Sequence, residues 1–114
     1  MIDYHVTIVN ALNSILPTHY EMALTSNTKT PCISYMEVGN AVAANGDTIG
    51  YSHLRYQIKV WGNNVADLQK YATQVDSALR ALGWIRISSF EMYDPNSTMI
   101  QKVITYEALA LETF

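Results

Sequence analysis

Three histidines and a single cysteine are the side chains best suited to catalysis or metal binding, at His5, His19, His53 and Cys32. Nucleophilic and metal sites need such groups near carboxylates, in spacings such as GxSxG, HExxH or CxxC. None of the four residues lies in such a pattern. We therefore expect surface or structural histidines and a buried core thiol, since free cysteine is among the most buried residue types.

Acidic pairs and glycines give no stronger signal for chemistry. Glu91 and Asp94 are close in the sequence, and Glu107 and Glu112 share a predicted strand. Solvated strand and turn positions explain these carboxylates more simply than acid–base catalysis does. The glycines lack the spacing of a phosphate-binding loop. The sequence predicts no enzyme activity, no metal and no cofactor.

Composition favours one folded domain that associates with other proteins. The 114 residues are 49% hydrophobic and only 15% charged, with a net charge of −3. This apolar content is enough for a core, and the length fits a single domain spanning 1–114. Tight nucleic-acid binding needs clustered cations, which are missing here. The 8 tyrosines and 2 tryptophans either fill the core or form contact surfaces.

Two elements are strongly patterned. In segment 53–61, Leu54, Tyr56, Ile58 and Val60 alternate with polar residues, which predicts a strand with one buried face. From Val65 to Leu82, apolar residues recur every three or four positions, which predicts an amphipathic helix. Asn64 is the expected N-cap and Gly83 the C-terminal glycine of this helix.

The remaining elements follow from weaker patterns. We expect a helix over 3–16 that starts at Asp3 and stops before Pro17, because apolar residues recur on one helical stripe. The other expected segments are a short strand at 18–24, a loop at 25–31 and strands at 32–38, 84–93 and 99–112. The fold class is then α+β, with an antiparallel or mixed sheet of about four to five strands and two helices packed on one face.

Segment 39–52 is rich in small residues and contains Asn45-Gly46, a strong hairpin signal. It is either a long β-arm or a flexible loop. As an arm, it could add a strand to a neighbouring subunit.

Candidate contact residues lie in this segment, on the polar face of strand 53–61, and at the turn near residue 94. The polar face is either a subunit contact or an ordinary wet sheet face. The predicted interface residues are Val42, Asn45, Asp47, Tyr51, His53, Arg55, Lys59, Trp61, Tyr93 and Asp94.

The order of elements and four local patterns resemble a known family. After the first helix comes Thr30-Pro31-Cys32-Ile33-Ser34-Tyr35, and a later strand ends in Trp61-Gly62. A helix with an aliphatic stripe then runs over 66–83. Tyr93-Asp94-Pro95 leads to a strand containing Val103-Ile104-Thr105-Tyr106. In this order, the patterns resemble the tail-completion or tail-terminator (head-to-tail joining) proteins of long-tailed siphophages.

The resemblance implies a structural role in a virion. Members of that family form a ring, usually hexameric, at the head-proximal end of the tail tube, which ends tube growth and joins tail to head. The implied partners are further copies of the chain, the tail tube protein and a head connector or adaptor, with DNA passing through unbound. The implied location is the virion tail or neck, and the host cytoplasm during assembly.

Two other functions stay open at this stage. One is a different neck or connector adaptor, which would bind the head instead of the tube. The other is a small ligand-binding domain of ferredoxin-like type, which would require a closed polar pocket.

Overall fold

A computed structural model describes residues 3–21, 29–44, 49–95 and 99–113 of the chain. The elements, in chain order, are α1 (His5–Leu12), β1 (Thr18–Tyr20), β2 (Cys32–Ala44), β3 (Ile49–Gly62), α2 (Val65–Ala81), β4 (Ile85–Asp94) and β5 (Met99–Thr113).

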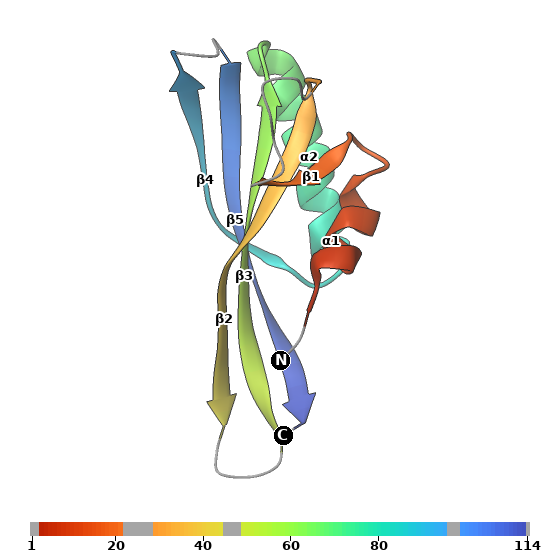
Figure 1. Ribbon diagram of the computed structural model, residues 1–114, viewed down its shortest axis with the longest axis vertical. Coiled ribbons are helices and arrows are strands. Elements are labelled where there is room, and N and C mark those ends of the chain that lie inside the picture. Colours follow the sequence, from red (N-terminus) through yellow and green to blue (C-terminus); the bar gives the residue numbers. More distant parts are fainter. Residues whose placement is uncertain (1–2, 22–28, 45–48, 96–98, 114) are drawn as a thin grey trace.

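The strands form one five-stranded sheet in the order β1-β2-β3-β5-β4. β1 pairs in parallel with β2, whereas the β2–β3, β3–β5 and β4–β5 pairs are antiparallel. The predicted α+β class with a mixed sheet and two helices is confirmed. Figure 1 shows both helices beside one half of the sheet, and the other half continues as strands alone.

The core lies between the helices and one face of the sheet. Leu54, Tyr56, Ile58 and Val60 of β3 are all fully buried, as the alternation predicted. The two helices contribute core residues that recur at helical spacing, and strands β2 and β5 contribute the other core residues of the sheet. These further core residues include Ile8, Leu12, Ile33, Leu68, Val75, Leu79, Ile104 and Tyr106.

Helix α2 follows the sequence signals closely. The Asn64 side chain accepts hydrogen bonds from the backbone N–H groups of Ala66 and Asp67, at 2.9 and 3.2 Å, so the predicted N-cap is confirmed. Gly83 adopts a positive φ of 90°, the backbone form that a C-terminal glycine permits.

The first helix is shorter than predicted. It ends at Leu12, not at residue 16, and its N-cap is Tyr4, although the Asp3 carboxylate accepts from the His5 N–H at 2.9 Å. Beyond Leu12 the Asn13 side chain accepts from the Thr18 N–H at 3.2 Å. This turn brings the chain back to the sheet edge, where β1 begins.

Two of the strand predictions also needed correction. β1 covers only Thr18–Tyr20 of the expected 18–24, and residues 22–28 lie outside the described residues. β2 does not end at residue 38 but continues to Ala44, because a bulge between Glu37 and Gly39 shifts the register without breaking the pairing with β3.

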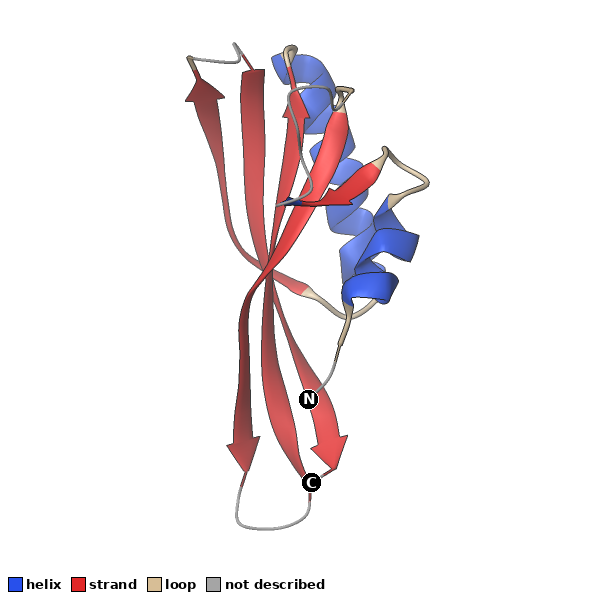
Figure 2. Ribbon diagram, viewed as in Figure 1, coloured by secondary structure: helices blue, strands red, loops and turns tan. Residues whose placement is uncertain are grey.

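Segment 39–52 is extended wherever it is described. Residues 39–44 belong to β2 and residues 49–52 to β3, with Ala44 opposite Gly50. The predicted Asn45-Gly46 turn lies outside the described residues. β3 also pairs here with the end of β5, from Leu109 to Thr113. Figure 2 shows this three-stranded arm projecting away from the helices.

Candidate interaction surface

The polar row predicted on β3 lies on the face of the sheet opposite the core. His53 and Arg55 are exposed, and Gln57, Lys59 and Trp61 are half-buried. They alternate with the buried Leu54–Val60 set, so one strand positions all five side chains. The structure thus brings together the predicted contact residues between positions 53 and 61 of β3.

A carboxylate on the neighbouring strand partly neutralises the charges of this row. Glu107 of β5 lies opposite Arg55, and its Oε1 is 3.3 Å from Arg55 Nε and 3.9 Å from His53 Nδ1. His53 and Arg55 are exposed and Glu107 is half-buried, so solvent screens the ion pair and it contributes little to stability. It does fix the direction of the Arg55 side chain.

The other end of the row is more enclosed. Lys59 forms an ion pair with Glu21, and its ammonium lies 5.9 Å from the centre of the Trp61 ring. The Trp61 indole N–H donates to the buried Ser34 hydroxyl at 2.8 Å. Trp61 is thus held by a hydrogen bond to β2 while part of its ring stays accessible.

The remaining predicted contact residues are dispersed. The backbones of Val42 and Tyr51 lie in the arm, whereas Asn45 and Asp47 fall outside the described residues. Tyr93, 62% exposed, lies at the end of β4, and the backbone of Asp94 pairs with Met99 at the far end of the sheet from the arm.

An exposed apolar strip on β4 was missed by the sequence reasoning. β4 is an edge strand, and it carries four exposed apolar side chains besides Tyr93: Ile85, Ile87, Phe90 and Met92. Segment 84–93 was recognised as a strand. Its place at the sheet edge depends on the strand order, which the sequence does not specify.

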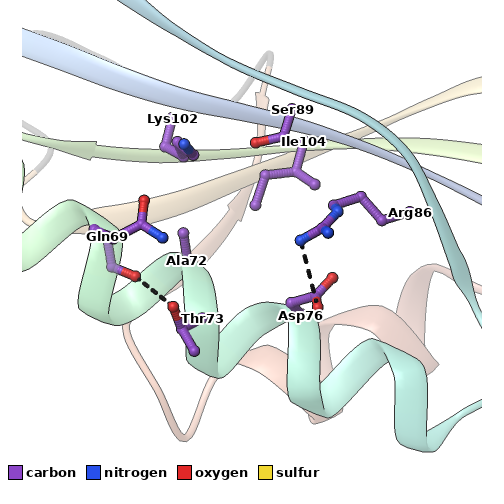
Figure 3. Close-up of a pocket in the computed structure, with 8 residues that line it drawn as sticks. All are labelled: Gln69, Ala72, Thr73, Asp76, Arg86, Ser89, Lys102 and Ile104. Carbon is purple, nitrogen blue, oxygen red and sulfur yellow. Dashed lines mark hydrogen bonds and ion pairs between the residues drawn. The ribbon is translucent and has the colours of Figure 1, made fainter.

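A polar cleft of about 350 Å³ lies between α2 and the β4–β5 pair (Figure 3). Its charged residues already have partners: Arg86 Nη1 is 3.6 Å from Asp76 Oδ2, and Lys102 Nζ is 3.6 Å from Glu91 Oε1. The cleft is lined by Gln69, Ala72, Thr73, Asp76, Arg86, Ser89, Lys102 and Ile104.

Asp76 links the helix to the sheet at one end of this cleft. Its Oδ1 accepts a hydrogen bond from the Tyr106 hydroxyl at 3.0 Å, and its Oδ2 lies 3.2 Å from Arg80 Nε. Burial, and then the hydrogen bond to Asp76, raise the pKa of Tyr106. The hydroxyl is therefore held neutral, as a hydrogen-bond donor, which suits a structural role.

His5 and Cys32 occupy structural positions. The His5 ring packs among Tyr20, Tyr35 and Tyr56 with centroid distances of 5.6–5.7 Å, and its Nε2 is 3.4 Å from Glu37 Oε2. Cys32 is buried, as predicted, and burial raises the pKa of its thiol. Within the described residues, no group of three or more His, Cys, Asp or Glu side chains is arranged to hold a metal ion.

Comparison with solved structures shows a fold similar to that of this chain in another protein. The same architecture occurs in a virion. The chain is similar to a chain of the virion of the native gene transfer agent (GTA) particle, with a TM-score of 0.63. The match covers 92% of this chain and 84% of that chain, at 15% sequence identity. At this identity the similarity concerns the fold.

Searches by sequence add nothing to this similarity, because no protein-family model and no curated protein matches the chain. Among the described helices, none is both long and apolar enough to cross a bilayer.

Proposed function

We propose that this protein is a structural component of a phage-type virion, which forms a ring at the head-proximal end of the tail tube, ends tube growth and joins tail to head. The observation that carries the proposal is the fold similarity to a virion chain, which extends over 92% of the molecule. The ordered set of local patterns shared with tail-terminator proteins adds support for the position in the particle.

The shape of the molecule suits such a role. It measures 50 × 25 × 23 Å, and much of its length comes from the three-stranded arm of β2, β3 and β5. Beyond the residues that pair with β1, the outer edge of β2 has no strand partner within the described chain. Backbone groups on such an edge can pair with a strand of a neighbouring subunit.

Contacts of this kind between two different surfaces are heterologous, and they close into a ring when the rotation between subunits allows it. The arm and the polar row of His53, Arg55 and Lys59 would supply one of these surfaces. The mechanism is geometric: a closed ring covers the end of the tube, stops addition of tube protein and leaves a central passage for DNA.

Tube assembly in the presence of the protein tests this role. The tail tube protein from the same genome is polymerised with and without the purified chain, and tube lengths are measured by negative-stain electron microscopy. We expect shorter tubes with a ring at one end. Unchanged lengths and bare ends at all ratios would contradict the proposal.

A pair of charge reversals sharpens the experiment. Arg55→Glu changes the polar row, whereas Lys70→Glu makes the same change in charge on the exposed side of α2. We expect Arg55→Glu to weaken capping and Lys70→Glu to leave it intact. Binding to the head connector without any effect on the tube would instead identify a neck adaptor.

A further inference from the structure

The free edge of β4 is a second surface whose chemistry indicates a partner. β4 pairs with β5 on one side, and within the described chain no strand covers its other side over Ile85–Asp94. Edge strands usually carry prolines, lysines or other devices that block pairing. β4 has a bulge near its start but neither proline nor lysine, and Ile85, 67% exposed, begins a row of accessible apolar side chains.

The pairing with β5 shows which face of the sheet each β4 residue occupies. Arg86, Ser89 and Glu91 lie opposite Tyr106, Ile104 and Lys102, on the face that carries α2. Ile85, Ser88, Phe90 and Met92 lie opposite Glu107, Thr105, Val103 and Gln101, on the open face. Ile87 is an extra residue, a bulge, between Arg86 and Ser88. Because of this bulge, Arg86 and Ser88 lie on opposite faces of the sheet although they are two positions apart.

The arrangement of charged and apolar residues along β4 is complementary to the same arrangement on a second copy of the strand. Ile87 has no partner on β5, and we leave it out of the count along β4 in the same way for a second copy. If two β4 strands then run antiparallel about a two-fold axis at Ser89, Glu91 of each copy lies opposite Arg86 of the other. Met92 then lies opposite Ile85, and Phe90 opposite Ser88 beside the bulge. In each of these pairs the two residues lie on the same face of the joined sheet, as residues directly opposite each other on neighbouring strands must.

Other positions of the axis lose this match. An axis at Phe90 places Arg86 opposite Tyr93, and an axis at Ser88 places Arg86 opposite Ser89. In both arrangements the charges of Arg86 and Glu91 no longer meet. Charge complementarity therefore selects one register.

The existing ion pairs strengthen the selected register. Within one chain, Glu91 lies 3.6 Å from Lys102 and Arg86 lies 3.6 Å from Asp76. When Glu91 contacts Arg86 of a second copy, the two ion pairs join into one row of charges that alternate in sign. The row runs from Lys102 and Glu91 of one copy to Arg86 and Asp76 of the other. Arg86 and Glu91 are 45% and 47% exposed, so both can reach across the edge while keeping their partners.

We propose that a second copy of this chain binds along β4, through a two-fold antiparallel pairing centred on Ser89, which joins the two sheets into one. Such a contact is isologous and closes with two copies, so it is separate from a ring contact. It lies at the opposite end of the sheet from the arm and does not depend on the proposed function.

The test is sedimentation velocity of the full chain, from about 1 to 300 µM, a range that covers weak protein association. We expect a monomer–dimer equilibrium that weakens as salt is added, since the ion pairs are partly exposed. A monomer at every concentration would overturn the proposal, as would a dimer whose stability does not change when β4 is altered.

Charge-reversal variants test the register. Arg86→Glu and Glu91→Arg each place two like-charged pairs in the dimer, so each should weaken self-association about tenfold or more. Lys70→Glu on α2 is the matched control and should leave the equilibrium unchanged. Circular dichroism verifies that each variant is folded.

Mixing the two variants gives the most specific result. A mixed dimer of Arg86→Glu with Glu91→Arg contains two opposite-charge pairs, whereas each variant alone contains two like-charge pairs. We expect a fluorescently labelled Arg86→Glu chain to bind Glu91→Arg more tightly than it binds itself. Equal binding to both would overturn the Ser89-centred register, because a loss of local stability cannot be repaired by mixing.

Discussion

Tyr56 and Tyr106 lie directly opposite each other on β3 and β5, and both are fully buried, but their hydroxyl groups differ in hydrogen bonding. The Tyr106 hydroxyl donates to Asp76 at 3.0 Å, whereas the Tyr56 hydroxyl lies near the backbone of Tyr4 without a hydrogen bond of good geometry in the described structure. Two tyrosines in one core layer thus have distinct roles: one ties helix to sheet, and the other packs with aromatic rings.

The first prediction compares the two hydroxyl groups. Tyr106→Phe removes a hydrogen bond to a charged acceptor, so we expect the free energy of unfolding to fall by about 1–3 kcal/mol. Tyr56→Phe removes a buried hydroxyl without a partner, so its stability should match or exceed that of the wild type. Chemical denaturation measures both. An equal loss in the two variants would contradict the assigned roles.

Stability should also fall at alkaline pH because of Tyr56. Burial, and then the Glu37 carboxylate, raise the pKa of Tyr56 from 10.0 to about 12. A raised pKa means that the folded state retains its proton when the unfolded chain has lost it. The contribution of the Tyr56 hydroxyl to the free energy of unfolding is complete below pH 10.0. It is lost as pH rises through the folded pKa of about 12.

Tyr56→Phe isolates this contribution. Between these two pKa values, we expect the free energy of unfolding of the wild type to fall more steeply with pH than that of the variant. The two slopes should differ by up to about 1.4 kcal/mol per pH unit, the value for a difference of one bound proton. Urea denaturation at several alkaline pH values gives both slopes. Identical slopes would show that Tyr56 does not titrate differently on folding.

Gly83 and Gly39 offer a second matched pair. Gly83 ends α2 with φ +90°, where an added Cβ would meet no atom within 4 Å, so only backbone strain opposes Gly83→Ala. We expect a loss of about 1 kcal/mol. At Gly39 an added Cβ would make an ordinary contact of 3.5 Å with Arg55, so Gly39→Ala should be tolerated. Thermal unfolding compares the two, and the reverse order of stability would contradict this account.

The N-cap of α2 gives a further prediction. Asn64→Ala removes the acceptor of two backbone hydrogen bonds, at 2.9 and 3.2 Å, and should cost about 1 kcal/mol. Asn64→Asp should retain most of the stability, because a carboxylate can accept the same bonds. If Asn64→Asp is as unstable as Asn64→Ala, capping is not the cause.

Local patterns predicted the elements whose surroundings are simple. The alternation around Tyr56 and the stripe from Leu68 to Leu79 set the buried face of β3 and of α2, because burial on one side follows directly from period. The boundary of α1 could not be predicted. It depends on Asn13 accepting a hydrogen bond from Thr18, a contact that forms only when the chain turns back to the sheet.

The candidate surfaces were predictable only in part. The polar row from His53 to Lys59 follows from alternation within one strand. The apolar edge of β4 depends on strand order, and the partner of Arg55, Glu107, is 52 residues away in the sequence. Pairings over such distances are set by tertiary structure, which residue spacing alone does not encode.

The most direct test of the proposed role is to locate the protein on particles produced by the strain that encodes it. Antibodies against the chain, visualised with gold in negative-stain electron microscopy, should label the junction of tail and head. Label at that junction is the predicted result. Intact particles without label, with the protein free in the lysate, would contradict a structural role in the virion.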